Sequence, residues 1–290
     1  MNILDIQFND SSISTKSIEI IALDELYKRR YEMDHDPNKA HRVHFYLMIY
    51  IEEGEGTHFI DFKDYTFTKG SFIFVNKNQI QAFSLDSNIR GKAVLFTEAY
   101  IEQIQSNMNI AVFPQNYKNA SHEPIFTPSD KLIESSTTLL TEIQKEMQHN
   151  ESDNQIIMLL FSSLFMMLKR ERTDFKTSKL SSSQVKQFHQ FISLLVENFR
   201  EQRDASFYAK ALHISYKTLN NLCKLASNET VKQLIDSYII IEAKRHLVLD
   251  DKQIQEIAYH FGFMEVSNFV KYFKKHTLLT PSQFKKQSKS

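Results

Sequence analysis

The sequence predicts an α+β protein with two parts, a β-barrel or β-sandwich followed by an all-helical domain. Residues 44–96 alternate short apolar stretches with turn residues, a pattern typical of strands. From Pro128 onwards, apolar residues recur every three or four positions, which is the spacing of one helix face. The chain of 290 residues is long enough for two domains of about 100–150 residues and a connector.

Six apolar stretches account for the predicted strands, and turn residues separate each from the next. In chain order they read FYLMIYI, HFIDF, YTF, SFIFV, IQAFSL and KAVLF. Two helical stripes follow, one through Leu132, Leu139, Ile143 and Met147, the other through Ile156, Leu160, Leu164 and Met167. We predict a first domain at 1–128, a helical pair at 129–172, a linker at 173–183 and a second domain at 184–290.

Charge is divided unevenly along the chain, although the formal net charge is zero. Residues 1–175 carry 17 Lys and Arg against 25 Asp and Glu, whereas residues 176–290 carry 18 against 10. A basic second half suits a polyanionic partner, although uneven surface solvation would give the same pattern. We expect a cytoplasmic protein without a membrane span. The first residues lack a signal-peptide pattern, and the longest apolar run, 156–168, is shorter than the roughly 20 residues of a membrane helix.

The helical domain contains an internal repeat. KLASNETVKQL at 224–234 aligns with KKHTLLTPSQF at 274–284, an offset of 50 residues. Upstream, Ala209 aligns with Ala258 at an offset of 49, so the second copy holds one extra residue at the turn that contains Gly262. Each copy has the pattern of a helix, a tight turn and a second helix, which is a helix-turn-helix unit.

In the first copy, a short helix at 207–212 precedes Ser215, which is suited to cap a second helix at 216–225. The outer face of that second helix is rich in donors for base edges and phosphates. We predict DNA contacts here from Lys217, Thr218, Asn220, Asn221 and Lys224.

In the second copy, Gly262 ends the first helix, and the following helix buries Phe269 and Phe273. Its outer face offers valines for thymine methyl groups and polar side chains for bases and phosphates. The predicted DNA contacts here are Val266, Ser267, Asn268, Val270, Lys271 and Lys274.

Residues 231–249 have the pattern of one connecting helix of about 18 residues, which would span roughly 27 Å. Two recognition helices at this separation could enter successive major grooves, which recur about every 34 Å on one face of DNA. An ordinary helical bundle with solvated faces is the alternative interpretation. We favour DNA binding because the same turn pattern occurs twice.

This region resembles the AraC/XylS family of bacterial transcription regulators. The resemblance is strongest in IQEIAYHFGFMEVSNFVKYFKKHTLLTP at 254–281 and extends to HISYKTLNNLCK at 213–224. It implies tandem helix-turn-helix units that bind asymmetric sites in double-stranded DNA near promoters. Activation, with RNA polymerase as a further partner, is one expectation, and repression is the alternative. The sequence departs from the usual Phe, Thr-Gly, Arg and Gly of the family at Cys223, Asn228-Glu229, Ile239 and Leu278.

HRVHFYLMIYIEEGEGTHFIDF at 41–62 resembles the cupin-like arm that precedes this DNA-binding domain in many family members. Cupin enzymes hold a metal with two closely spaced histidines, a glutamate and a later histidine. His41 and His44 match the first part, but Gln81 stands where the late histidine is expected, and a carboxamide binds metals poorly. We predict no metal, no cofactor and no enzyme activity. A cupin-type metalloenzyme with an accessory helical domain is the alternative.

A cupin-like barrel could enclose a pocket for a small-molecule effector, although aromatic side chains more often fill a core. The candidate lining residues are Phe45, Phe59, Phe72, Phe74 and Phe83. The helical pair at 129–172 is apolar on several sides and needs a cover. We expect it to form a homodimer, and its packing on the barrel is the competing explanation.

A third hypothesis is a DNA-repair methyl acceptor of the kind sometimes fused to such helical units. That chemistry needs a reactive and accessible thiolate. The single cysteine, Cys223, lies on the inward side of a predicted recognition helix, so we disfavour this hypothesis.

Overall fold

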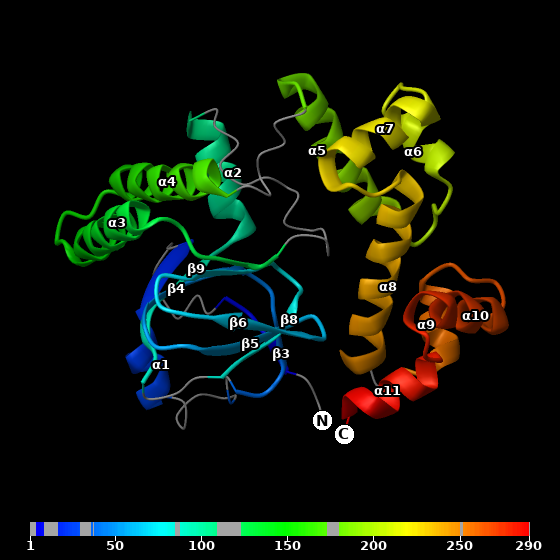
Figure 1. Cartoon of the computed structure of the whole chain (residues 1–290), viewed down its shortest axis with the longest axis horizontal. Coiled ribbons are helices and arrows are strands. Elements are labelled where there is room, and N and C mark those ends of the chain that lie inside the picture. Colours follow the sequence, from blue (N-terminus) through cyan, green and yellow to red (C-terminus); the bar gives the residue numbers. More distant parts are fainter. Residues whose placement is uncertain are drawn as a thin grey trace. The chain divides into compact units, whose positions relative to one another are not determined.

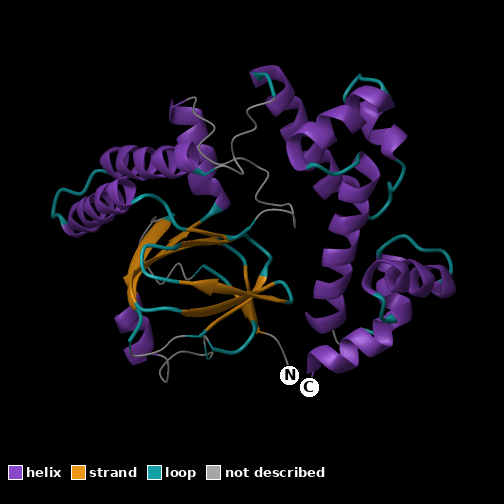
Figure 2. Cartoon of the chain, viewed as in Figure 1, coloured by secondary structure: helices purple, strands orange, loops and turns teal. Residues whose placement is uncertain are grey.

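The computed structural model describes residues 4–8, 17–29, 36, 38–84, 88–108, 123–172, 180–249 and 252–289. The chain divides into two compact units. We call residues 4–114 and 123–176 the sandwich unit and residues 177–290 the helical unit. Figure 2 shows strands and helices in the first unit and helices in the second, which confirms the predicted α+β class. Of the predicted linker, residues 173–179 lie outside the described residues.

The sandwich unit is built on two five-stranded sheets with the orders β1-β3-β8-β5-β6 and β10-β7-β4-β9-β2. Paired strands are antiparallel except β1 and β3. The strands are β1 (Leu4–Ile6), β2 (Ile18–Ala22), β3 (His41–Val43), β4 (Tyr46–Glu53), β5 (Gly56–Ile60), β6 (Lys63–Phe67), β7 (Phe72–Val75), β8 (Ile80–Phe83), β9 (Arg90–Phe96) and β10 (Ile125–Phe126). The six predicted strands are confirmed as β4 to β9.

Four helices lie among the described residues of the sandwich unit, and two of them cover one sheet (Figure 1). They are α1 (Leu23–Arg29), α2 (Glu98–Met108), α3 (Asp130–Gln148) and α4 (Asn154–Glu171). On α4, Phe161 and Phe165 contact Phe96 and Phe74 of the sheet, with ring centroids 5.2 and 6.1 Å apart. The helical pair therefore packs on the sheet of its own chain, as the competing explanation required.

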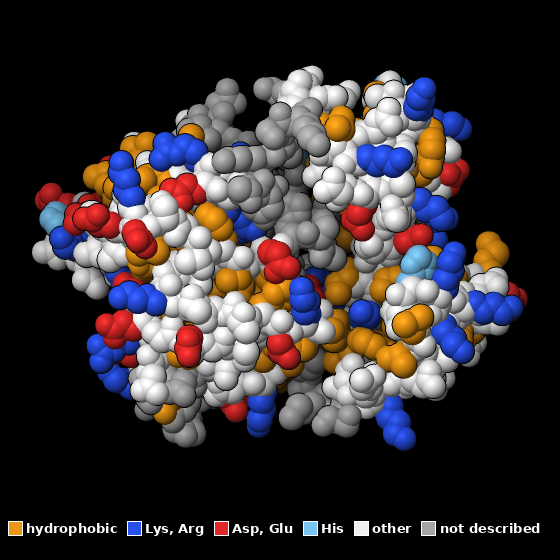
Figure 3. Space-filling view, in the orientation of Figure 1, with side chains coloured by type: hydrophobic (Ala, Val, Ile, Leu, Met, Phe, Trp, Pro, Cys, Tyr) orange, Lys and Arg blue, Asp and Glu red, His pale blue; other side chains and the backbone are white. Residues whose placement is uncertain are grey.

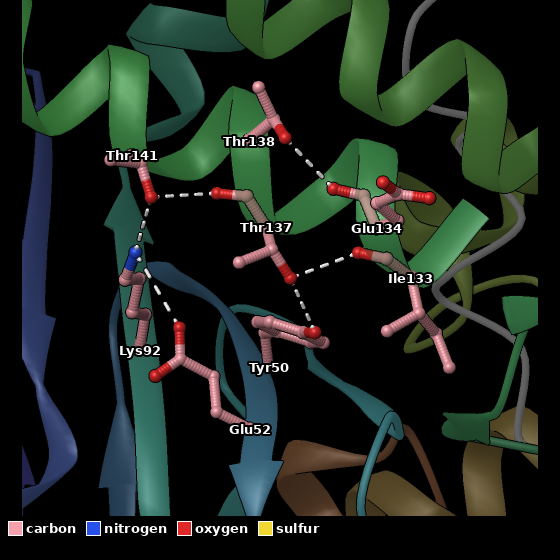
Figure 4. A network of polar contacts seen from close by, with 8 residues as sticks. All are labelled: Tyr50, Glu52, Lys92, Ile133, Glu134, Thr137, Thr138 and Thr141. Carbon is pink, nitrogen blue, oxygen red and sulfur yellow. Dashed lines mark hydrogen bonds and ion pairs between the residues drawn. The ribbon is translucent and has the colours of Figure 1, made fainter. Parts of the chain in front are cut away.

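Strand β4 is buried on both faces, which explains its uninterrupted apolar sequence. Leu47, Ile49 and Ile51 belong to the core between the two sheets. On the other face, the Tyr50 hydroxyl lies 2.8 Å from the Thr137 hydroxyl of α3. Figure 4 shows this contact beside a second one, in which Lys92 of β9 reaches α3. The polar contacts fix α3 against the sheet.

Three polar side chains are buried on the sheet that contains β3, β5 and β8. The Gln81 amide nitrogen donates to His41 Nε2 at 2.7 Å, and His41 Nδ1 lies 2.9 Å from the Lys39 carbonyl oxygen. His58 is completely buried, and the side chains of Gln81 and His41 lie close enough to act on its ring. Burial disfavours the charged imidazolium and lowers the pKa of His58 from 6.5 to about 3.

The helical unit confirms the predicted repeat. Its helices are α5 (Ser182–Asn198), α6 (Ala205–Ala211), α7 (Tyr216–Ser227), α8 (Val231–Leu249), α9 (Ile254–His260), α10 (Val266–Thr277) and α11 (Pro281–Lys289). The first turns correspond at an offset of 49, because Ile214 N donates to Ala209 O and Phe263 N donates to Ala258 O, each at 3.0 Å. The later helices correspond at an offset of 50, since α7 and α10 both end in a left-handed residue, Asn228 and Leu278.

The buried His58 predicts a pH-dependent stability of the sandwich unit. Between pH 6.5 and 3 the unfolded chain binds a proton on this residue and the folded chain does not, so stability falls as the pH falls. We expect the free energy of unfolding to fall by about 2 kcal/mol from pH 6.5 to 5 on account of His58, at about 1.4 kcal/mol per pH unit. Urea unfolding at the two pH values measures this loss.

The variant His58→Leu should lose that part of the pH dependence. His149→Gln, a change at an exposed turn between α3 and α4, is the matched control and should keep it. An equal fall in stability in wild-type and His58→Leu proteins would contradict the prediction.

Candidate nucleic-acid interface

The helices α7 and α10 are the second helices of the two helix-turn-helix units. Each of them buries one face and exposes the other. On α7, Leu219 and Leu222 are buried, and on α10, Phe269 and Phe273 are buried. Phe269 lies 5.9 Å from Phe273 between ring centroids, so aromatic packing holds α10 in its unit. This burial fixes which residues each helix presents outward.

The predicted DNA contacts lie mostly on these outward faces. The exposed ones are Lys217, Thr218, Asn221, Lys224, Ser267, Asn268, Lys271 and Lys274. Val266 and Val270 are half-buried at the edge of the α10 face. Lys and Arg side chains are prominent on the visible face of the helical unit in Figure 3. Such a surface can bind phosphates and read bases.

Asn220 differs from the other predicted contacts. It is half-buried, and its Oδ1 accepts a hydrogen bond from the Val231 backbone N–H at 3.2 Å. Val231 is the first residue of α8, so this side chain satisfies a donor that a helix start leaves without an intrahelical partner. Asn220 therefore joins α7 to α8, a role that the sequence pattern did not reveal.

Helix α8 connects the two helix-turn-helix units over 19 residues and confirms the predicted connecting helix. It contacts α6, α7, α9 and α11, so elements of both units pack on it. Ile239, Ala243 and Leu247 are fully buried. Ile239 thus acts as an apolar core residue, at the position where an arginine is usual in the resembled family.

Arg203, in the turn between α5 and α6, braces the turn of the second unit. Its guanidinium donates to the Phe261 carbonyl oxygen and lies 3.4 Å from the ring centroid of Phe263. Between these residues, Gly262 has a φ of +67°, and a Cβ there would collide with the Arg200 carbonyl oxygen. The sequence pattern gives no sign of this role of Arg203, because its partner lies 58 positions away.

A second brace joins α10 to α8. The Tyr272 hydroxyl donates to the Asp236 carboxylate at 2.8 Å, and the ring of Tyr272 lies 5.4 Å from that of Phe263. Burial and the nearby carboxylate raise the pKa of Tyr272, which keeps its proton on the donating oxygen. The orientation of α10 about its own axis is fixed by these contacts.

The single cysteine lies inside this framework. Cys223 is buried on the inward side of α7, and burial raises the pKa of its thiol to about 12. A thiol that stays protonated and inaccessible is a poor nucleophile. The geometry therefore gives no support to the methyl-acceptor hypothesis.

In the sandwich unit, the two histidines of the metalloenzyme alternative have separate partners. His41 is buried beside Gln81, whereas His44 Nε2 lies 3.4 Å from the Asp5 carboxylate. Among the described residues, no group of three or more His, Cys, Asp and Glu is placed to hold a metal ion. No described helix is long and apolar enough to cross a membrane.

The five candidate pocket phenylalanines do not lie together. Phe45 and Phe83 belong to the core between the sheets. Phe72 and Phe74 stack on each other on the face that α4 covers, as the contact of Phe74 with Phe165 shows. Phe59 is half-buried and contacts Phe62. The prediction of one pocket lined by all five is corrected, because alternate strand residues point to opposite faces of a sheet.

Known protein families match both the sandwich unit and the helical unit. An AraC-like ligand binding domain matches residues 23–165, and a helix-turn-helix domain matches residues 208–287. The transcriptional activator RhaS of Enterobacter sp. (strain 638) is 21% identical over 246 residues, which cover 84% of this chain and 86% of RhaS. The activator RhaR of Salmonella dublin is 20% identical over 258 residues, which cover 88% and 89%.

Among solved structures, ToxT from Vibrio cholerae is similar to the chain with a TM-score of 0.46 and 16% identity, over 93% of this chain and 98% of ToxT. The two matched domains occur here in one chain, and the second spans most of the repeated helix-turn-helix region. The chain belongs to the AraC family of DNA-binding transcription regulators.

Proposed function

We propose that α7 and α10 read one asymmetric DNA site together, each in its own major groove. The observation that carries this proposal is the repeated geometry of the two units, whose polar outward faces are joined by the buried helix α8. The contacts proposed are the residues predicted from sequence, with Asn220 acting mainly through α8. A metalloenzyme is disfavoured, because His41 and His44 are engaged with different partners.

Two substitutions on α10 separate base reading from phosphate binding. Asn268→Ala should relax selectivity at one base pair and cost about 1–3 kcal/mol of binding free energy on the preferred site. Lys274→Ala should weaken binding to all sequences and lower the dependence of log K on log salt by about 1. Binding titrations on preferred and scrambled duplexes at several salt concentrations measure both effects.

The control for these variants is Lys131→Ala, which removes an equal charge from α3 of the sandwich unit. We expect it to leave affinity, selectivity and salt dependence unchanged. If Asn268→Ala and Lys274→Ala bind like the control, the proposed reading face is wrong.

We propose further that the exposed stripe of α4 forms a homodimer. Ile156, Leu159 and Met166 are 44%, 56% and 46% exposed although α4 packs its other face on the sheet. With the exposed Ser163, they follow alternating steps of three and four residues, the spacing of a coiled-coil seam. A second copy of α4 would remove this apolar stripe from water.

The variant Leu159→Lys should therefore shift the protein from dimer to monomer, since a buried unpaired charge at the seam is unfavourable. Analytical ultracentrifugation at micromolar concentration measures the change. Thr138→Lys adds the same charge to an exposed position of α3 and should remain dimeric. A wild-type protein that is monomeric under these conditions would rule out this interface.

We propose that a small-molecule effector binds the sandwich unit near His58 and Gln81. The match to an AraC-like ligand binding domain supports this, as does the burial of these two polar side chains, since buried polar groups are positioned to bind a polar ligand group. A ligand bound there should raise the melting temperature of the wild-type protein and act much less on His58→Leu. A library in which every stabilising compound acts equally on both proteins would contradict this location.

The matched relatives are transcriptional activators. We propose that this protein is located in the cytoplasm and activates transcription by contact with RNA polymerase. In vitro transcription with purified polymerase that fails to respond to the protein at its bound promoter would contradict activation.

A further inference from the structure

The one residue by which the second helix-turn-helix turn exceeds the first is Met264. His213 and Gly262 are the left-handed residues of the two turns and correspond at an offset of 49, whereas the N-cap residues Ser215 and Glu265 correspond at 50. Met264 is therefore the inserted residue. It is 92% exposed, the highest exposed fraction of any large apolar side chain among the described residues. The turn that carries it leads directly into α10 (Figure 1).

The N-cap side chains of the two recognition helices are used differently. In the first unit, Ser215 Oγ accepts a hydrogen bond from the Thr218 backbone N–H at 3.0 Å, so its acceptor is occupied. In the second unit, Glu265 makes no such cap hydrogen bond and its side chain is exposed. A serine at this N-cap position would stabilise the helix better than a glutamate that makes no cap hydrogen bond. Within the described part of the chain, the carboxylate therefore stands at the start of α10 without a cap hydrogen bond to occupy its acceptors.

A carboxylate on a DNA-reading surface is repelled by phosphates unless it accepts hydrogen bonds from a base. Ionised carboxylates are acceptors only, so the acceptor groups of guanine and thymine in the major groove do not suit Glu265. Adenine presents an acceptor beside its amino group, whereas cytosine presents its amino group alone. Cytosine is the base that Glu265 fits best.

We propose that the inserted turn of the second unit is a specificity element, in which Glu265 accepts from the N4 amino group of a cytosine and Met264 packs against an adjacent thymine methyl group. The N-terminal residues of a recognition helix are those that reach base edges, which puts both side chains in range. This inference rests on the proposed entry of α10 into a major groove. It adds two residues that lie before the predicted contacts of that helix.

Selection of bound DNA from a random pool by the full-length protein tests the proposal, followed by competition binding on four duplexes that differ at the selected base pair. We expect wild-type protein to prefer cytosine at one position by about tenfold. Glu265→Gln should change that preference from cytosine to adenine, because a carboxamide pairs with the adenine N6 and N7 edge. Met264→Ala should reduce the preference for thymine at the neighbouring position by about threefold.

Two further variants separate base reading from a role in stability. Glu265→Ser should restore the helix cap and raise the melting temperature while it abolishes the cytosine preference. Glu256→Gln removes the same charge from α9 and keeps a residue suited to its capping box, so it should leave every base preference unchanged.

Unchanged base preferences in Glu265→Gln and Glu265→Ser would overturn the inference and leave the proposed function standing. A wild-type protein that selects no sequence at all would overturn both. A simultaneous change at positions read by Asn268 would show that Glu265 acts through the helix rather than on a base, and would also overturn the proposal.

Discussion

The burial of α8 is the constraint on which the proposed DNA-binding surface depends. Residues from both helix-turn-helix units pack on this helix, and Ile239, Ala243 and Leu247 have no exposed surface. Its 19 residues span about 28 Å at about 1.5 Å each, close to the repeat of about 34 Å between major grooves on one face of DNA. Because a shift of α8 would expose apolar surface on several sides, the spacing and rotation of α7 and α10 are built into the core. Asn220 and Asp236 extend this control, since each ties a recognition helix to α8 by a hydrogen bond.

The two helix-turn-helix units reach the same geometry with different residues, and each holds a residue that does not favour the left-handed conformation it adopts. In the turns, Gly262 adopts a positive φ easily, whereas His213 in the first unit carries a Cβ in the same conformation. At the ends of the recognition helices, Asn228 suits the left-handed conformation better than Leu278 does. The second unit has an added support in Arg203, which fixes its turn from outside the unit. A firmly held turn is a suitable place from which to present the exposed Met264 and Glu265.

The sequence predicted the elements whose patterns are local and strong. The strands β4 to β9, the connecting helix and the helix-turn-helix repeat all follow from apolar periodicity, turn residues and self-alignment. The edge strands β1 and β2 escaped prediction because they are short and only partly buried. The predicted stripe through Ile156 and Leu164 does not lie on a single buried face, since Ile156 is exposed and Leu164 is buried. Helix α4 is apolar on two sides, and periodicity does not show which side is covered. Contacts such as Arg203 with Phe261 join distant positions, and no single-sequence pattern encodes them.

The central claim is that one rigid helical unit reads two successive major grooves on one face of DNA. Dimethyl sulfate protection on a selected binding site, at guanine N7 in the major groove, measures this directly. We expect two protected segments whose centres lie about 10 base pairs apart on the same face of the duplex. If Lys217→Ala weakens protection in one segment and Lys271→Ala weakens it in the other, the first segment is assigned to α7 and the second to α10. A single protected segment, or two segments on opposite faces, would contradict the account.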